Sequence, residues 1–211
     1  MEWVLQLPVL FFSVVIHEFS HGVVAYEKGD DTAERAGRLT LNPMSHVDAF
    51  GTIFLPVFCM LVNAPVFGWA KPVPVDTSRL KDPRRDSIKV AFAGPASNVT
   101  LAFVAAVAFK LVKTTALLSA GMRQTVLHTL LFAVTINLFL ALFNLLPIFP
   151  LDGSRVLGGL LPPRARAVYL RHAPYGMIIL LFVLLTSGLN TLVVLPLKVI
   201  LALWYKVGLL G

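Results

Sequence analysis

The stretch WVLQLPVLFFSVVIHEFSHGVVAY, residues 3–26, decides the fold class of this chain. It contains one glutamate and two histidines but no lysine, arginine or aspartate. At about 1.5 Å per residue, a helix of this length crosses a hydrocarbon core of about 30 Å. The stretch therefore predicts a membrane-spanning helix that carries titratable side chains inside the bilayer.

The composition of the whole chain is also that of a membrane protein. Of its 211 residues, 57% are hydrophobic and 14% are charged, and the mean hydropathy is +0.79. Soluble globular domains carry about 25% charged residues. The net charge of +7 arises from Lys and Arg in short segments between apolar runs, which is typical of cytoplasmic loops. Because no aromatic-rich basic module accompanies this charge, we expect no nucleic-acid partner.

Further apolar runs predict the other spans. Four are long enough to cross the bilayer, at residues 88–112, 125–146, 169–187 and 189–209. Another run, residues 52–67, is interrupted by prolines, so a short tilted helix and a re-entrant hairpin both fit it. If the basic segments at 27–50, 69–87 and 148–170 all face the cytoplasm, this run enters and leaves on one side, which favours the re-entrant alternative.

Two segments between the spans have the pattern of short strands. Residues 37–43 alternate apolar and polar side chains before a turn, and residues 68–75 are kept extended by Pro72 and Pro74. The sequence therefore predicts an all-α polytopic membrane protein with about five to six transmembrane helices, one of them short or re-entrant, and short membrane-associated β-strands. We expect residues 1–211 to form a single domain.

The pattern His-Glu-x-x-His lies within the first span, at His17, Glu18 and His21. Residues four apart share one face of a helix, so both imidazoles can direct a nitrogen at one cation. Zinc accepts such nitrogens at about 2.0–2.1 Å, and Glu18 is close enough to take a proton from a metal-bound water. A charged group costs about 2.5–3.5 kcal/mol at mid-span, so three such residues on two turns predict a metal site.

A catalytic zinc needs a third protein ligand and one open position. Asp152 is a candidate, within the segment NLLPIFPLDG at residues 144–153, where two prolines and a glycine keep the backbone out of regular helix. Irregular backbone is tolerated at membrane depth where it lines a cavity. An aspartate before a glycine is equally compatible with a surface turn, so the spacing alone leaves both alternatives open.

Three motifs together resemble the site-2 protease family of intramembrane zinc metalloproteases, in particular its compact prokaryotic branch. They are HEFSH at residues 17–21, GPASN at residues 94–98 and NLLPIFPLDG at residues 144–153, in the order found in the family. The resemblance covers most of the chain. It implies that Asp152 is the third ligand of one zinc ion, beside His17 and His21. Many members also carry a PDZ or CBS domain or an earlier span, which this sequence does not show, so gating and regulation are not transferred.

The same resemblance suggests roles for two asparagines. Asn144 matches the asparagine eight residues before the ligand aspartate, near the scissile carbonyl, where its amide can donate to the developing oxyanion. Asn98 matches an asparagine near the active-site cleft and is expected to contact substrate. Either amide could instead join neighbouring helices, because such side chains hydrogen-bond across spans.

These residues predict an intramembrane zinc metalloprotease that hydrolyses peptide bonds of transmembrane substrate helices, with Glu18 as the catalytic base. We expect it in the lipid bilayer of a bacterial or archaeal cytoplasmic membrane. Because a helix hides its carbonyls in hydrogen bonds, the substrate must unwind locally. The extended segments near residues 39–41 and 73–75 could hold it by strand pairing.

Three alternatives belong to other classes of protein. A membrane di-iron lipid oxidase or hydroxylase needs several histidine clusters, whereas His46, His128 and His172 lie in separate segments. A non-catalytic zinc-binding membrane protein needs four protein ligands, and three candidates are found. A membrane protease with the same motif and a distant glutamate ligand has no candidate, because no glutamate follows Glu34.

Overall fold

The computed structural model describes residues 3–54, 58, 61, 71–115 and 118–211. In this part of the chain every regular element is helical. In chain order the elements are α1 (Trp3–Glu27), α2 (Thr32–Arg35), η1 (Pro43–His46), η2 (Ala49–Phe54), η3 (Thr77–Arg79), α4 (Pro83–Thr114), α5 (Ala120–Asn144), α6 (Asp152–Leu160), α7 (Pro163–Leu170), η4 (Ala173–Tyr175), α8 (Gly176–Leu185), η5 (Asn190–Val194) and α9 (Leu195–Lys206). The elements η2 and η5 are π-helical, and the other η elements are 3-10 turns.

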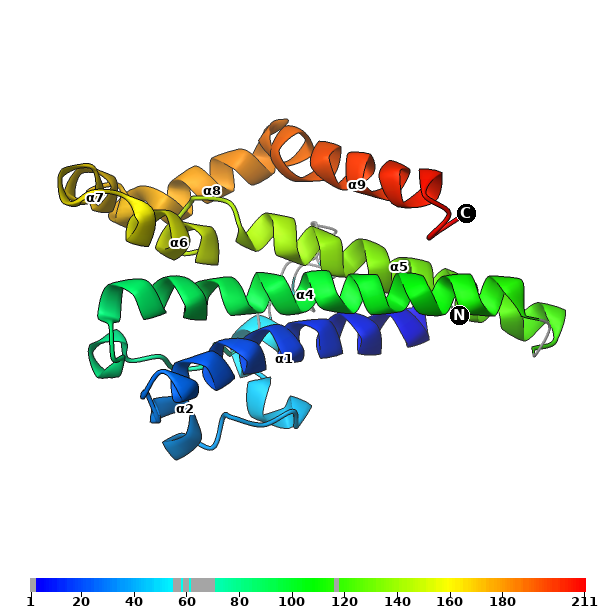
Figure 1. Ribbon diagram of the computed structural model, residues 1–211, viewed down its shortest axis with the longest axis horizontal. Helices are drawn as coiled ribbons and strands as arrows, with labels where there is room; N and C mark the ends of the chain where they lie inside the picture. The colour runs from blue at the N-terminus through cyan, green and yellow to red at the C-terminus, as the bar shows by residue number, and fades with distance from the viewer. Residues whose placement is uncertain (1–2, 55–57, 59–60, 62–70, 116–117) are drawn as a thin grey trace.

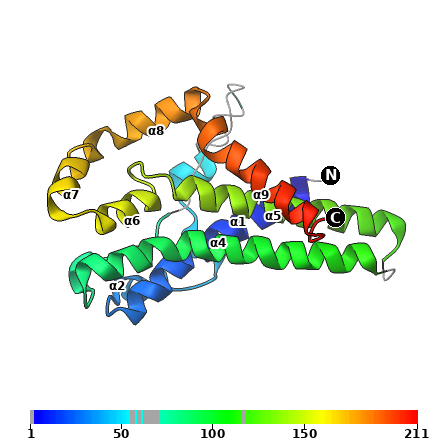
Figure 2. The ribbon, with the colours of Figure 1, turned by 45° about the horizontal axis from the view of Figure 1, so that its top comes forward.

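Three long helices, α1, α4 and α5, run alongside one another and form the centre of the molecule (Figures 1 and 2). Ala102, Ala105 and Ala106 of α4 pack against Val134 and Leu138 of α5 in a buried cluster. Small side chains let membrane helices approach closely, which increases van der Waals contact and permits hydrogen bonds between helices. The alanines therefore explain why α4 and α5 can bring polar groups within bonding distance.

The start of α4 shows how the sequence sets a helix boundary. The Asp82 side chain accepts hydrogen bonds from the backbone N–H groups of Arg84 and Arg85, at 3.2 and 3.0 Å. Pro83 occupies the first turn, where its missing N–H leaves no helical bond unmade. This boundary places the rest of α4, including the GPASN motif, at a defined depth beside α1.

Four helices or helical stretches are long and apolar enough to cross a membrane: Val4–Glu27, Pro83–Thr114, Ala120–Asn144 and Pro163–Leu185. They confirm four of the predicted spans. The predicted span at 189–209 is represented by η5 followed by α9, which is shorter. Many side chains on the outside of these helices are large and apolar, such as Leu7, Phe103 and Phe182. The chain is therefore a multi-pass membrane protein.

The predicted short β-strands are not found among the described residues. Residues 39–40 form bends before η1, and residues 71–76 have no regular secondary structure. A strand needs a neighbouring extended backbone to form a ladder, and alternation in one sequence cannot show whether such a neighbour exists. The predicted re-entrant segment at 52–67 lies largely outside the described residues.

Parts of the segments that were predicted to face the cytoplasm lie at one end of the molecule. The end of α1 with α2, the start of α4, and α6 with α7 are all at the left of Figure 1. The turn from α4 to α5 lies at the opposite end. This arrangement agrees with the placement of basic residues, which are kept on the cytoplasmic side of a membrane.

The last third of the chain folds back over the central helices. After α5, the elements α6, α7 and α8 follow an arc, and α9 returns along α5 (Figure 2). A second buried cluster, formed by Leu146, Leu151, Leu180 and Val193, joins the turn after α5 to α8 and η5. This cluster fixes the start of α6 close to α1 and α4.

Candidate metal centre and active site

The motif residues His17 and His21 lie one turn apart on α1 and point to the same place. Their Nε2 atoms are 3.1 Å apart, and both side chains are buried, with exposures of 6% and 8%. Inside a bilayer the backbone must satisfy its own hydrogen bonds, so an apolar run of this length forms a continuous helix. The helix then presents two imidazole nitrogens to one point in the interior.

Asp152 brings a carboxylate to that point from the far part of the chain. Its Oδ2 atom lies 3.1 Å from His17 Nε2 and 3.2 Å from His21 Nε2. Within the described residues, these three side chains form the one group of three or more His, Cys, Asp or Glu residues able to hold a metal ion. The structure therefore brings together the three residues that the sequence predicted as zinc ligands.

The position of Asp152 depends on a close approach between α6 and the end of α5. A Cβ atom at Gly153 would lie 2.1 Å from the backbone oxygen of Leu145 and 2.5 Å from that of Leu146. Only glycine fits at this distance. The Asp-Gly pair therefore provides both the carboxylate and the space that lets it reach α1.

Asp152 lies at the start of α6, outside the four membrane-spanning stretches. Burial alone would raise the pKa of its carboxyl group. Without a bound cation, hydrogen bonds donated by His17 and His21 outweigh the burial and hold the pKa of this carboxyl group well below its usual range; a bound cation would take the place of those protons. The carboxylate is therefore ionised at neutral pH, as a metal ligand must be.

The hydrogen bonds at Nδ1 show which nitrogen of each imidazole is free. His21 Nδ1 lies 2.7 Å from the backbone oxygen of Val90, which can only accept, so this nitrogen carries the proton. His17 Nδ1 lies 2.6 Å from Asn98 Oδ1, which also accepts. In neutral imidazoles both Nε2 atoms then keep a lone pair. Both lone pairs point toward Asp152 Oδ2.

Zinc fits this arrangement. Three lone pairs that converge over 3.1–3.2 Å repel one another unless a cation lies between them. Ligands at about 2.0–2.1 Å from a tetrahedral zinc are about 3.3 Å apart, close to the observed separations. Gly94 of α4 keeps the space open, because a Cβ atom there would lie 2.5 Å from His21 Nε2 and 2.6 Å from His17 Nε2. The donor atoms and the free space both fit one ion.

Glu18 faces the irregular segment at residues 71–76, which follows η2 in the chain. Its Oε2 atom accepts a hydrogen bond of 2.9 Å from the backbone N–H of Val73. The segment is itself attached to the C-terminal end of α1, since the Asp76 N–H donates to Asp30 Oδ2 at 2.7 Å. The Arg38 guanidinium donates to the backbone oxygen of Pro72 at 2.9 Å. These bonds hold Glu18 beside the metal ligands.

A cavity of about 180 Å³ borders the metal group. The cavity is lined by the three candidate ligands, by the catalytic candidates and by apolar side chains of residues 71–76. Its residues include His17, Glu18, His21, Val73, Val75, Asn144, Asp152 and Arg155. Asn144 donates one amide N–H to the Leu140 oxygen at 3.0 Å, which leaves its second N–H for another acceptor. The cavity therefore offers a base, an amide donor and a metal group to one bound molecule.

Asn98 lies elsewhere. It is completely buried, does not line the cavity, and contacts His17 from the side away from it. The predicted contact with substrate has no support in this position. Asn98 instead contacts a metal ligand, and its side-chain oxygen accepts a hydrogen bond from the Nδ1–H of His17.

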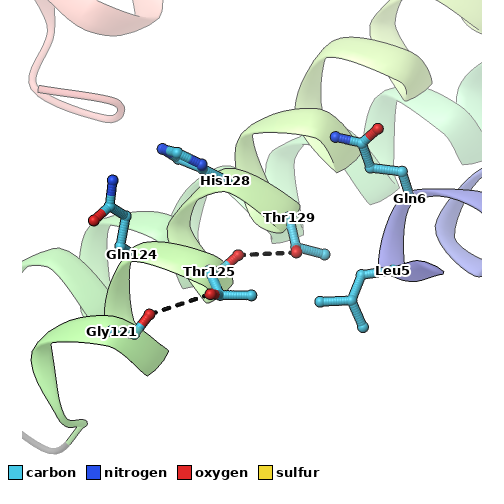
Figure 3. Close-up of a pocket in the computed structure, with 7 residues that line it drawn as sticks. All are labelled: Leu5, Gln6, Gly121, Gln124, Thr125, His128 and Thr129. Carbon is cyan, nitrogen blue, oxygen red and sulfur yellow. Dashed lines mark hydrogen bonds between the residues drawn. The ribbon is translucent and has the colours of Figure 1, made fainter. Parts of the chain in front are cut away.

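A second cavity, of about 170 Å³, lies between the N-terminal parts of α1 and α5 (Figure 3). It is lined by Gln6 of α1 and by Gln124 and His128 of α5, among others. The hydroxyls of Thr125 and Thr129 donate to carbonyls of their own helix, at 3.1 and 2.9 Å. None of the predicted site residues lines this cavity, so it is separate from the metal group.

Several residues at the site were not predicted from the sequence. Asn137 bonds Asn98, and its amide in an apolar span was a usable signal, because polar residues inside membranes are costly. Ser13 lies one turn before His17 and could have been found by helical spacing. Arg155 lines the cavity and lies three residues after Asp152 on the same helix. The contact of Val73 with Glu18 had no signal in the sequence.

Comparison with known proteins identifies the family. The profile of Peptidase family M50 matches residues 6–125 and 110–187. The chain belongs to Peptidase family M50. This confirms the resemblance to the site-2 proteases that the motifs indicated. No solved structure is significantly similar to the chain.

Relatives of this M50 chain include bacterial and archaeal proteins. It is 42% identical over 194 residues to "Putative zinc metalloprotease YwhC" of Bacillus subtilis, covering 89% of this chain and 82% of that protein. It is 27% identical over 188 residues to "Putative zinc metalloprotease Rip2" of Mycolicibacterium smegmatis, covering 89% and 69%. An archaeal relative, "Putative zinc metalloprotease MJ0611" of Methanocaldococcus jannaschii, is 46% identical over 70 residues, a third of each chain.

Membership of family M50 bears on the classes of protein left open above. It supports a membrane metalloprotease rather than a di-iron oxidase. Together with the His17, His21 and Asp152 group, it confirms zinc as the expected cofactor. Among the described residues no second cluster of metal-binding side chains is present that could hold two irons.

Proposed function

We propose that this M50 chain is an intramembrane endopeptidase that hydrolyses peptide bonds within the transmembrane helices of other proteins, in the cytoplasmic membrane. The observation that carries the proposal is the convergence of His17 Nε2 and His21 Nε2, on a membrane-spanning helix, with Asp152 Oδ2, within 3.1–3.2 Å of one another. A cavity with Glu18 on its wall opens beside them. Structural zinc sites use four protein ligands, whereas catalytic ones use three.

When bound, zinc polarises a carbonyl group and lowers the pKa of water. Glu18 acts as the base that takes the proton of the attacking water and returns it to the leaving amine. The hydrogen bond from the Val73 N–H holds one carboxylate oxygen, which leaves the other free to face the cavity. The free N–H of Asn144 donates to the carbonyl oxygen as negative charge develops on it.

The cavity wall also suggests how the substrate is held. Residues 71–76 form neither helix nor strand, and Val73 and Val75 line the cavity. A transmembrane helix must lose its internal hydrogen bonds before a peptide bond can be attacked. A non-helical segment beside the base gives the unwound substrate a backbone to pair with, and main-chain bonds provide affinity in such pairings. Residues 1–211 act as one catalytic unit in this proposal.

The proposal is tested by the Glu18→Gln variant, which keeps the size of the side chain and removes the base. Membranes of cells that express the wild type or the variant are compared by mass spectrometry of protein termini. New termini inside transmembrane segments are expected with the wild type and not with the variant, because loss of a general base costs about 10²–10⁴-fold in rate. Zinc content is expected to be equal in both.

The control is Glu27→Gln, which changes an exposed glutamate at the end of the same helix. This variant is expected to cleave as the wild type does. Equal cleavage by the Glu18→Gln variant and the wild type would contradict the role of Glu18. Cleavage confined to segments outside the membrane would contradict intramembrane proteolysis.

A further inference from the structure

Behind His17, three polar side chains from three helices form a hydrogen-bonded network across the centre of the bundle. They are Ser13 of α1, Asn98 of α4 and Asn137 of α5, with exposures of 3%, 0% and 2%. Polar groups at this depth are costly unless they are paired. The proposed reaction uses none of the three directly, so their presence needs another explanation.

Backbone carbonyls, which can only accept, determine the direction of each hydrogen bond in the network. The Ser13 hydroxyl faces the Val9 oxygen at 2.8 Å and therefore donates to it. The Ser13 oxygen is left to accept from Asn137 Nδ2 at 2.9 Å. The same nitrogen donates to the Ala133 oxygen at 2.9 Å. The nitrogen end of the Asn137 amide is thus assigned, and its oxygen faces Asn98.

The assignment continues from Asn137 to His17. Asn98 Nδ2 donates to Asn137 Oδ1 at 2.8 Å and to the Ser13 backbone oxygen at 3.2 Å. The oxygen end of the Asn98 amide is then the atom that lies 2.6 Å from His17 Nδ1. An amide oxygen only accepts, so His17 carries its proton on Nδ1 and keeps the lone pair on Nε2.

The two histidines are held with the proton on Nδ1 by different kinds of acceptor. His21 bonds directly to the backbone oxygen of Val90 at 2.7 Å, and no side chain can change that acceptor. His17 depends on an amide that could rotate by 180° and present its nitrogen instead. Asn137 and Ser13 prevent that rotation, because a rotated Asn98 would place its oxygen against two other acceptors.

We propose that Ser13, Asn98 and Asn137 are positioning residues that hold His17 in the tautomer able to bind zinc. The inference rests on the metal site proposed above. Groups that orient a metal-bound histidine typically change metal affinity by about 10–100-fold. The network therefore acts on zinc affinity from a distance, with Ser13 and Asn137 acting through Asn98.

The test measures the Kd for zinc of the purified chain in detergent, by competition with a chelating dye. Asn98→Leu is expected to raise the Kd by about 10–100-fold, because the His17 N–H loses its acceptor. Ser13→Ala and Asn137→Leu are expected to raise it by a smaller factor. The two smaller effects should be less than additive in the double variant, since both act on the same amide.

Ser20→Ala is the matched control for Ser13→Ala. Both hydroxyls donate to the carbonyl four residues earlier on α1, at 2.7 Å for Ser20 and 2.8 Å for Ser13. Only the Ser13 hydroxyl also accepts from Asn137. A loss of affinity in Ser13→Ala but not in Ser20→Ala therefore reports the network rather than a general change in α1.

A second measurement is the ¹⁵N NMR spectrum of histidine-labelled, zinc-loaded protein, in which protonated and metal-bound ring nitrogens give different shifts. The wild type should show a protonated Nδ1 and a metal-bound Nε2 for His17, and Asn137→Leu, which removes one of the two acceptors that orient Asn98, should show a mixture. Unchanged affinity and an unchanged His17 tautomer in both Ser13→Ala and Asn137→Leu would overturn the inference. If the wild type itself bound no zinc, the metal site would fail instead, so the two failures are distinguishable.

Discussion

His17 Nε2 and Asp152 Oδ2 lie 3.1 Å apart, although 135 positions separate the two residues in the chain. The first belongs to a membrane-spanning helix and the second to the turn that follows another span. Neither residue alone can hold zinc in a membrane, because a catalytic site needs three protein ligands. The contact makes one site out of two distant motifs, and the predictions below depend on it.

Asp152→Ala is expected to lower the zinc content from one ion per chain to nearly none, since two histidines remain as ligands. Inductively coupled plasma mass spectrometry of the purified protein measures this directly. The control is Asp31→Ala, which removes a partly exposed carboxylate that pairs with Arg35 and Arg79 at the surface. Exposed pairs contribute about 0–1 kcal/mol to stability, so the control should retain zinc. Full zinc content in Asp152→Ala would disprove the shared site.

Gly94→Ala is expected to abolish zinc binding while the helices remain folded. The added methyl group would lie 2.5 Å from His21 Nε2 and 2.6 Å from His17 Nε2, in the space that the ion needs. Zinc content and circular dichroism are measured together. Gly121→Ala is the control, because its Cβ atom would meet no atom within 4 Å. Normal zinc binding by Gly94→Ala would show that α4 does not border the ion.

Gly153→Ala is expected to displace Asp152 and to reduce both zinc binding and thermal stability. The new Cβ atom would lie 2.1 Å from the Leu145 oxygen, and overpacking of this kind costs about 1–3 kcal/mol. On the same helix, Gly158→Ala would place its Cβ atom 3.7 Å from the Tyr169 ring, an ordinary contact. Thermal unfolding in detergent should separate the two variants. Equal unfolding temperatures would argue against the close approach of α6 to α5.

Val73→Pro is expected to keep zinc but to slow cleavage by about 10–100-fold. Proline lacks the N–H that donates to Glu18 Oε2, and a hydrogen bond to a charged group contributes about 1.5–3 kcal/mol. Val73→Ala keeps the N–H and should stay close to the wild type. Rates are compared on a transmembrane substrate identified through the Glu18→Gln experiment. Equal rates for Val73→Pro and Val73→Ala would assign the contact no role in positioning the base.

Local spacing and composition were sufficient for part of this protein. The apolar runs predicted four spans that the structure confirms. This was possible because a long apolar segment inside a bilayer must satisfy its own backbone hydrogen bonds, which a helix does. The His17 and His21 pair could be predicted because four residues make about one helical turn. The family was also evident from the motifs, and the profile of family M50 confirms it.

The rest depended on how the helices pack. Alternation suggested a strand at residues 37–43, and prolines suggested an extended segment at residues 68–75. The described residues provide no partner strand, and pairing is a property of two segments. From spacing alone, Asp152 could have been either a zinc ligand or part of a surface turn. The family resemblance, and not the spacing, favoured the ligand. Asn98 was expected to face substrate, whereas helix packing places its oxygen 2.6 Å from His17 Nδ1.

The sequence by itself therefore determined which segments enter the membrane and which two imidazoles share a helical face, because both follow from short-range periodicity. Only the tertiary structure decided that the Asp152 carboxylate joins the two imidazoles and that the amide of Asn98 is hydrogen-bonded both to His17 and to the amide of Asn137. Those contacts join helices far apart in the chain, and they form where Gly94 and Gly153 let backbones approach within the reach of a side chain. The distance between two helices is set by how their side chains pack, and it cannot be read from the spacing of residues along the sequence.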